Sequence, residues 1–288
     1  MTRSILVIGA TSPIGSAVSA ELARQGWDVT GTSTRPNDGG TRVLDVNDEG
    51  SVRAALDAVR PRAVVTLASP RPTVDGEPDV AARAAASLHR LRDLSALGGA
   101  RSLVFASSSA VYGTAHTAPR REQDQLDPAS AYARLKAASE SALASPAETD
   151  IATVSLRIFN VYGPGLHSSL INRMFAGSGD VPDVLDTDDF VRDYVHVSDV
   201  ARAFAATVDN DKLGHNVVNV GTGVGTGNRL LLAARGAKAL ARPVGPGFLS
   251  SSVADISRLR ELPGADPLVD LGELLRRDDR TRSDLIWG

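Results

Sequence analysis

The chain of 288 residues contains no cysteine. This absence excludes disulfides, thiolate metal sites and a cysteine nucleophile, and it is compatible with a reducing cytosol. The chain also lacks an excess of charge, because 31 basic residues stand against 34 acidic ones and give a net charge of −3. A chain without excess positive charge has no compositional support for binding a nucleic acid.

Long hydrophobic runs are missing at the N-terminus. Arg3 precedes a short apolar run, Ile5 to Ile8, which meets Gly9 at once. This run is far too short for a secretory or membrane segment. We therefore expect a cytoplasmic protein with no membrane partner. The 42% of hydrophobic residues that are present suffice for a substantial core in one large domain or two small ones.

The apolar run from Ser4 to Ile8 has the character of a buried parallel strand, and it leads directly into a glycine-containing turn. A helix is expected from Pro13 to Gln25, with Gly26 as its stop. Strand, glycines and helix in this order predict a dinucleotide site in which the helix N-terminus faces a pyrophosphate, although an ordinary turn is the alternative. The expected contacts are Gly9, Thr11, Ser12, Pro13, Ile14 and Gly15.

The next predicted strand, Asp28 to Thr32, is followed by Ser33, Thr34 and Arg35. A carboxylate at this place accepts hydrogen bonds from the ribose hydroxyls of NAD and repels the 2′-phosphate of NADP. Hydroxyls and a guanidinium suit a phosphate, so the sequence predicts a preference for NADP(H) over NAD(H). The alternative is an Arg35 side chain that only points into water.

Strand and helix patterns then alternate through Arg42–Leu44, Val52–Val59, Ala63–Ala68 and Ala81–Leu97. This alternation predicts an α/β fold with a doubly wound parallel sheet of the Rossmann type. Residues at the ends of two of these strands would then lie along the cofactor, or else be ordinary strand ends. They are Asp45, Val46, Leu67, Ala68 and Ser69.

Tyr132 and Lys136 are four residues apart in a segment that begins with a capping-type Ser130 and stops before Pro146. In a helix both side chains lie on one face. An ammonium near a phenol favours the phenolate and lowers the phenol pKa, so the pair can exchange protons with a carbonyl or an alcohol. A bare Tyr-x-x-x-Lys is more often an incidental pair on a surface helix, and only the surrounding motifs can favour catalysis.

An apolar strand, Leu103 to Ala106, runs into the serine cluster Ser107–Ser109. Together with Glu122, Ser130, Tyr132 and Lys136, it closely resembles the extended short-chain dehydrogenase/reductase family of NAD(P)-dependent nucleotide-sugar epimerases, dehydratases and reductases. The resemblance covers nearly the whole chain. It implies that Ser108 binds the reacting oxygen, that Tyr132 is the general acid/base, and that Lys136 holds the nicotinamide ribose and lowers the Tyr132 pKa. It also implies that Ser109 contacts the substrate.

The second half of the chain resembles the same family at two more motifs. The strand end Leu156–Gly165 is similar to the family segment whose asparagine, here Asn160, approaches the substrate diphosphate. Phe190–Val200 resembles the segment whose arginine, here Arg192, pairs with that diphosphate, and a guanidinium fork suits phosphate oxygens. His196 has no matching Cys or His ligands, so we expect no metal. Asp199 is expected to cap the helix that follows.

The resemblance also implies a division of the chain and an assembly. Residues 1–162 and 195–221 are expected to form the NAD(P)-binding Rossmann domain, and residues 163–194 and 222–288 a smaller substrate-binding region. A homodimer is expected through the helix of Tyr132 and the helix before it. Two positions depart from the family pattern, because Ala84 stands where a supporting asparagine is usual and Thr66 where a histidine is usual.

The predicted function is NADPH-dependent reduction of a nucleotide-linked keto sugar, with a 4-keto-6-deoxyhexose as the expected substrate and Tyr132 as the proton donor. The absence of an acid at Ser33 and the nearby Arg35 favour net reduction. An NAD(P)-dependent nucleotide-sugar epimerase or dehydratase is the alternative. Reduction of a non-sugar ketone is disfavoured by Asn160 and Arg192, and an NADP-binding redox sensor without catalysis by the presence of Ser108, Tyr132 and Lys136.

Overall fold

The chain is described from a computed structural model. The residues that the structure describes are 3–35, 41–68, 79–113, 117–146, 150–175, 184–185, 188–209, 213–235, 241–242, 250–277 and 286. One predicted cofactor contact, Ser69, lies outside these ranges.

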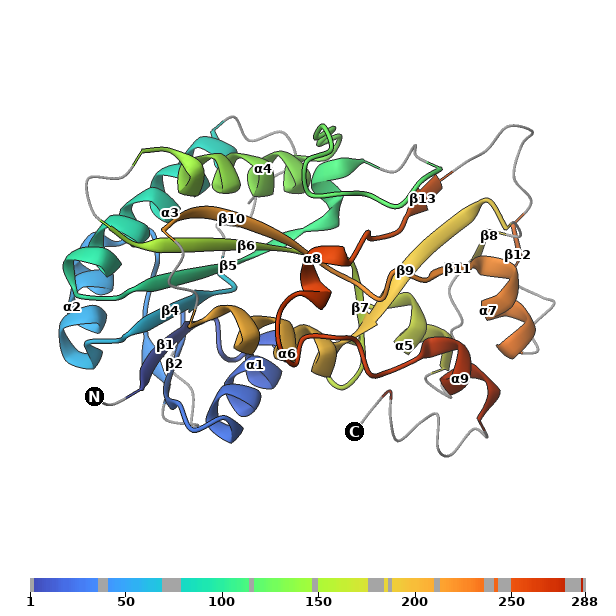
Figure 1. Cartoon of the computed structure of the whole chain (residues 1–288), viewed down its shortest axis with the longest axis horizontal. Helices are drawn as coiled ribbons and strands as arrows, with labels where there is room; N and C mark the ends of the chain where they lie inside the picture. Colours follow the sequence, from blue (N-terminus) through green and yellow to red (C-terminus); the bar gives the residue numbers. More distant parts are fainter. Residues whose placement is uncertain are drawn as a thin grey trace.

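A seven-stranded sheet with every neighbouring pair parallel runs through the larger part of the molecule (Figure 1). Its order places the first strand between the second and the fourth, so the chain reverses its direction of winding at that point. This is the predicted doubly wound Rossmann-type sheet, and the prediction is confirmed. In spatial order the strands are β10 (Gly214–Val220), β6 (Ala152–Ile158), β5 (Ser102–Ser108), β4 (Ala63–Thr66), β1 (Ser4–Ile8), β2 (Asp28–Ser33) and β3 (Arg42–Val43).

Both faces of this sheet are covered, which explains why its strands are continuous apolar runs rather than alternating ones. Successive side chains point to opposite faces, so Ile5 and Val7 join one hydrophobic cluster while Leu6 and Ile8 join another. In Figure 1, α1 and α6 lie below the sheet and α3 and α4 above it. The covering helices are α1 (Pro13–Arg24), α2 (Glu49–Val59), α3 (Val80–Leu97), α4 (Ala131–Ala144) and α6 (Val197–Thr207).

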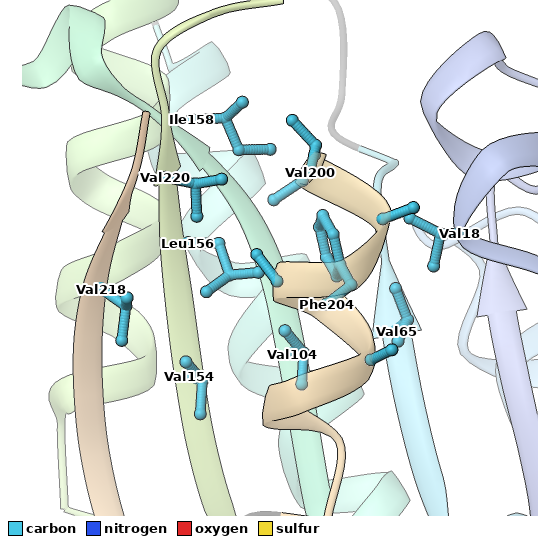
Figure 2. Packing of buried hydrophobic residues seen from close by; sticks show 14 of the residues in the cluster. Val18, Val65, Val104, Val154, Leu156, Ile158, Val200, Phe204, Val218 and Val220 are labelled. Atoms are coloured by element: carbon cyan, nitrogen blue, oxygen red, sulfur yellow. The ribbon is translucent and has the colours of Figure 1, made fainter. Parts of the chain in front are cut away.

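The lower cluster shows how one helix covers several strands. Phe204 and Val200 of α6 are fully buried and lie against Leu156 and Val104 of the central strands (Figure 2). Val18 joins them from α1. Burying a side chain of this size contributes about 1.5–3 kcal/mol each, so this packing holds the strand ends in place.

A second, smaller group of elements lies at one end of the large sheet (Figure 1). Its core is a four-stranded sheet in which β9 (Phe190–His196) pairs with three short strands. The remaining elements are β7 (Asn160–Tyr162), β11 (Gly225–Gly227), β13 (Ser250–Ser252), the separate pair β8 (Val184–Leu185) and β12 (Ala241–Arg242), and the helices α5 (Leu170–Phe175), α7 (Asn228–Arg235), α8 (Ser257–Arg260) and α9 (Leu271–Arg276).

This smaller part has its own hydrophobic cluster, in which Tyr162 and Tyr194 pack with leucines of α7 and α9. Part of the C-terminal segment packs outside this cluster. Ala254, Ile256 and Leu259 are buried in the lower cluster of the large sheet. The division of the chain into a cofactor domain and a substrate region stays a prediction, and these three residues link its two halves.

The prediction that Asp199 caps the helix after β9 is wrong. Helix α6 is capped by His196, whose ring nitrogen accepts from the backbone N–H of Ser198, and Asp199 lies in the first turn. Asp199 is buried, and its carboxylate accepts hydrogen bonds from the backbone N–H of Val269 and from the guanidinium of Arg202. In the described part of the chain, no helix has the length and hydropathy that crossing a membrane requires.

Candidate active site

Helix α4 carries the predicted catalytic pair, and its start is defined by Ser130. The Ser130 hydroxyl accepts from the backbone N–H of Ala133 at 3.0 Å, which is the predicted N-cap. Tyr132 and Lys136 then lie one turn apart, with the Lys136 Nζ 5.6 Å from the centroid of the Tyr132 ring. Tyr132 is 49% exposed, whereas Lys136 is only 4% exposed.

The carboxyl end of β5 lies against this helix and meets it at three successive residues. Ser108 lies beside Tyr132, close enough for its hydroxyl to lower the pKa of the phenol. The Lys136 Nζ donates to the carbonyl oxygen of Ala106 at 2.6 Å. Between them, Ser107 donates from its hydroxyl to the carboxylate of Glu140. The structure thus brings together the three predicted catalytic residues, Ser108, Tyr132 and Lys136, and adds Glu140.

Two of these groups have shifted pKa values. Burial raises the pKa of the Tyr132 phenol, and the neighbouring Ser108 hydroxyl acts in the opposite direction. Because half of this side chain is exposed, solvent screens much of the rise. Burial lowers the pKa of Lys136 to about 8, and the Glu140 carboxylate opposes that change. The lowering of the Tyr132 pKa by Lys136 stays a prediction, since the ammonium donates to Ala106.

Ser109 was predicted to contact the substrate. It begins the short 3₁₀ helix η1 (Ser109–Tyr112) and is buried, together with Val111 and Tyr112. The Ser108 hydroxyl caps this helix by accepting from the N–H of Ala110 at 3.2 Å. Of the two serines, Ser108 is therefore the one beside Tyr132, and a substrate contact of Ser109 stays a prediction.

The glycine turn after β1 has the shape that a dinucleotide pyrophosphate needs. Gly9 has φ +86°, where a side chain is strained. A Cβ on Gly15 would lie 2.2 Å from the carbonyl oxygen of Gly9, so only glycine lets α1 begin so close to the turn. Ser12 caps α1 through the N–H of Gly15, while Thr11 and Pro13 are exposed. Together with the partly buried Ile14, these residues fit a bound cofactor at the helix N-terminus.

At the end of β2, Ser33 is buried and donates to the carbonyl oxygen of Arg35, which shapes the turn. Thr34 and Arg35 are exposed and follow the strand directly. No carboxylate occupies the first position after the strand. The arrangement leaves the Arg35 guanidinium accessible to an anion such as a 2′-phosphate.

The remaining predicted cofactor contacts lie at the ends of β3 and β4. Asp45 is exposed, and its carboxylate accepts from the N–H of Asn47. Leu67 and Ala68 are partly buried beyond β4. Val46 is buried and lines a small cavity, about large enough for one water molecule. The other residues around this cavity include Thr66, Ala68, Ala84, Ser87 and Phe105.

Asn160 and Arg192, the predicted diphosphate contacts, lie in neighbouring strands of the small sheet. Asn160 donates to the carbonyl oxygen of Asp193 at 3.2 Å. Arg192 donates to the carbonyl oxygen and the hydroxyl of Ser250, each at 2.9 Å, and stacks 3.7 Å from the centroid of the Phe190 ring. The structure brings the two residues into one sheet, and each is already held by intramolecular hydrogen bonds.

The loop after β7 connects this small sheet to the glycine turn. A Cβ on Gly165, which has φ +77°, would lie 3.1 Å from the Pro13 side chain. The β7 end therefore touches the start of α1, and the sites predicted for cofactor and substrate share a border. Among the described residues, no cluster of three or more His, Asp or Glu side chains has the arrangement of a metal site.

A family model matches residues 5–221 of the chain, from β1 to the end of β10, and its description is "NAD dependent epimerase/dehydratase family". The chain belongs to this family. The matched range contains the glycine turn, Ser108, Tyr132 and Lys136, as well as Asn160 and Arg192. The predicted membership in the extended short-chain dehydrogenase/reductase group of enzymes is thereby confirmed.

Three similar members of the family bear on substrate and cofactor. A UDP-glucose 4-epimerase of Mycolicibacterium smegmatis is 29% identical over 93% of this chain and 95% of its own. A dTDP-4-dehydro-6-deoxyglucose reductase of Escherichia coli is 33% identical over 43% of this chain and 42% of its own. The solved structure of MoeE5 in complex with UDP-glucose and NAD has a TM-score of 0.79 and 26% identity, and covers 98% of this chain and 99% of that protein.

Sequence reasoning missed Glu140, Arg157 and Tyr112, which are buried beside the catalytic pair. The carboxylate of Glu140 pairs with the guanidinium of Arg157 at 2.6 Å, and Arg157 also donates to the Tyr112 hydroxyl at 2.8 Å. One signal was available, since Glu140 follows Lys136 by four residues and must share its helix face. An acidic residue on an alanine-rich helix is usually solvated, so the spacing alone did not single it out.

Proposed function

We propose that the protein is an NADPH-dependent ketoreductase acting on a nucleotide-linked keto sugar, with a 4-keto-6-deoxyhexose as the expected substrate. The observation that carries the proposal is that Tyr132 lies beside Ser108 and above a buried Lys136, whose Nζ donates to Ala106, at the carboxyl end of a parallel sheet. Ligands of doubly wound folds bind at this edge, near the point where the strand order reverses.

Ser108 and Tyr132 would hold the carbonyl oxygen of the sugar between their hydroxyl groups. When bound, the nicotinamide cofactor supplies the hydride that reduces the carbonyl carbon. Tyr132 donates its phenolic proton to the oxygen, so the carbonyl gains one hydride and one proton and becomes an alcohol. The ammonium of Lys136 favours release of that proton by stabilising the phenolate.

The preference for NADP(H) rests on the end of β2. An exposed Arg35 follows the buried Ser33, and a guanidinium is the side chain best suited to a phosphate monoester. MoeE5 was solved with NAD, so the choice of cofactor is a property in which this chain is proposed to differ.

The nucleotide part of the substrate is proposed to contact Asn160 and Arg192. Their neighbouring positions on β7 and β9 support a shared diphosphate ligand, since an amide and a guanidinium both donate to phosphate oxygens. The relatives support a nucleotide sugar as well, because the names of three similar proteins include UDP-glucose or a dTDP-linked 4-keto sugar.

A second candidate is epimerisation of a UDP-sugar with a retained NAD. The similarity to the M. smegmatis UDP-glucose 4-epimerase over 93% of the chain favours it, because the reductase matches only 43%. In that reaction Tyr132 would first accept a proton from the sugar hydroxyl and later return it. The same residues serve both reactions, and they differ in whether cofactor is consumed. A redox sensor that binds NADP without catalysis would leave every substrate unchanged.

The deciding experiment incubates the protein with NADPH and a panel of UDP- and dTDP-linked 4-keto sugars and, separately, with NAD and UDP-glucose. We expect stoichiometric oxidation of NADPH and formation of a sugar alcohol with one of the keto sugars. Formation of UDP-galactose from UDP-glucose without net cofactor oxidation would contradict the reductase proposal and favour the epimerase.

The dimer also belongs to the proposal. Helices α3 and α4 pack against each other over much of their length and are proposed to meet the same pair in a second copy. Sedimentation equilibrium should give twice the chain mass of 30.1 kDa, and a monomer at micromolar concentration would contradict the assembly.

A further inference from the structure

Glu140 lies one helical turn beyond Lys136, and its buried carboxylate has no part in the proposed reaction. We propose that Glu140 is a positioning residue, whose buried carboxylate keeps Lys136 protonated and whose ion pair with Arg157 keeps that carboxylate in line with Lys136 and Tyr132. The inference rests on the proposed function only for what Lys136 does during the reaction. The electrostatic relation between the two side chains stands independently of it.

The geometry of α4 against β5 places Glu140 in the same row as the catalytic residues. Tyr132, Lys136 and Glu140 succeed one another at intervals of four residues, so they share one face of the helix. Ser108, Ala106 and Ser107 of β5 are their respective partners. A movement of Glu140 along the helix axis would break the contact with Ser107 and displace Lys136 with it.

Arg157 holds the carboxylate from the neighbouring strand. Ser107 and Arg157 are directly paired between β5 and β6, so both reach Glu140 from one side of the sheet. The guanidinium donates to Glu140 Oε2 from Nη2 at 2.6 Å and from Nε at 3.1 Å. It also donates to the carbonyl oxygen of Glu122 at 3.0 Å, and the Tyr112 ring lies 4.8 Å from its centre. A buried charge with this many partners has a fixed position.

The charge balance explains why the pair affects the lysine. Glu140 is 5% exposed and Arg157 is buried, so water screens their interactions with Lys136 poorly. Burial lowers the pKa of Lys136 to about 8, and Glu140 is the charge that opposes this effect. Among the described residues, the ionisable groups around the lysine include Tyr132 and Glu140 from α4 and, on the far side of Glu140, Arg157 from β6. From β10, His215 interacts with Glu140 and Arg157, and burial lowers the pKa of its ring to about 4, so it is neutral near pH 7.

Removing one charge of the pair at a time gives opposite expectations. Glu140→Gln leaves two cations, Lys136 and Arg157, in one buried cluster, so the pKa of Lys136 falls further. Arg157→Gln leaves the Glu140 carboxylate without the guanidinium that neutralises its charge. The carboxylate then acts more strongly on Lys136, so the pKa of the lysine rises. A purely structural pair would not produce shifts of opposite sign, because both variants lose the same ion pair.

The composition of the chain makes this measurable, because the sequence contains only three lysines, Lys136, Lys212 and Lys238. Protein labelled with ¹³C at lysine Cε is titrated by NMR from pH 6 upward, and Lys136→Met assigns the signal. We expect the midpoint of Lys136 to fall by about one pH unit in Glu140→Gln, a tenfold change in protonation, and to rise in Arg157→Gln. Ser107→Ala, which removes a contact but no charge, should move the midpoint less than either.

An unchanged Lys136 midpoint in folded Glu140→Gln would overturn the proposal, and so would shifts of the same sign in the two charge variants. Circular dichroism establishes that each variant is folded. If Glu140→Gln does not fold, Glu140→Asp takes its place. This variant moves the carboxylate away by one methylene and must lower the titration midpoint of Lys136 by a smaller amount. No shift in that variant would equally contradict the inference.

Activity supplies a second readout. Reduction that depends on the Lys136 ammonium declines as pH rises through the pKa of the lysine. The alkaline limb of kcat should therefore move to lower pH in Glu140→Gln, and by a smaller amount in Glu140→Asp. If no ketone is reduced by the parent protein, the proposed function fails while the lysine titration still decides the electrostatic inference.

Discussion

The catalytic pair and the proposed diphosphate contacts are held in different ways. Lys136 and Glu140 are buried and bind consecutive residues of β5, inside a sheet whose strands are all parallel. Arg192 is half-buried in a sheet of short strands, and its guanidinium donates to the carbonyl oxygen of Val191 and to Ser250. The proton-transfer groups therefore have positions fixed by the core, whereas the diphosphate contacts must share or exchange hydrogen bonds when a ligand binds.

The two sheets also differ in how deeply their residues are buried. The four central strands of the large sheet, β6, β5, β4 and β1, bury nearly every residue. The small sheet is built around β9 from three-residue strands with sequences such as Gly-Thr-Gly and Ser-Ser-Ser, which contribute little apolar surface. The more deeply buried sheet thus carries the proposed catalytic pair, and the sheet with less apolar surface carries the proposed nucleotide contacts.

Tyr132→Phe tests the catalytic side of this comparison and should have the largest effect. It removes the hydroxyl that is proposed to donate the proton, so kcat for ketone reduction should fall by about 10²–10⁴-fold. KM for the nucleotide sugar should hardly change, because the phenol is not a proposed nucleotide contact. Steady-state oxidation of NADPH measures both constants.

Tyr162→Phe is the matched control for this loss. Its hydroxyl is buried and has no hydrogen-bond partner among the described residues, so its removal should leave kcat unchanged and stability equal or higher. A Tyr132→Phe variant with parental kcat would contradict the assignment of the proton donor.

Arg192→Lys tests the proposed diphosphate contacts in the small sheet. Lysine keeps the charge but loses the planar fork and the stacking on Phe190. A hydrogen bond to a charged group contributes about 1.5–3 kcal/mol, so KM for the nucleotide sugar should rise roughly tenfold or more, while kcat changes little. Arg229→Lys, at an exposed pair with Asp188, is the control that should leave both constants unchanged. A fall in kcat alone would place Arg192 with the catalytic groups and remove the contrast.

Arg35→Ala should have the smallest effect, because the side chain is exposed and contacts at most one end of the cofactor. We expect the ratio of kcat/KM for NADPH to that for NADH to fall by about tenfold, the loss of one charged hydrogen bond to a phosphate. Arg53→Ala, on the surface of α2, should leave the ratio unchanged. A parent protein that prefers NADH would contradict the cofactor proposal before any variant is made.

The large sheet could be predicted from sequence because each of its strands is a short apolar run between recognisable helices. The glycine turn and α4 were predictable for a related reason, since Ser12 and Ser130 cap the helices that follow them. The small sheet could not be predicted in this way. Its pairing of β9 with β13 joins residues about sixty positions apart, and three serines carry no strand pattern of their own.

The catalytic environment shows the same limit. Spacing identified Tyr132 and Lys136, but the burial of Glu140 depends on Arg157, which arrives from a strand seventeen residues further along the chain. A charged residue within an apolar run, as Arg157 is within β6, was the available sign that a buried partner exists.

A single residue, Phe159, separates the last residue of β6 from the first residue of β7. Phe159 is buried, and its N–H donates to the carbonyl oxygen of Val220. At a second crossing β9 passes into α6 without any intervening residue (Figure 1). Neither connection offers a slack linker, so a rotation of one sheet against the other has almost no backbone torsions to absorb it. The two sheets are therefore expected to diffuse and tumble as one body.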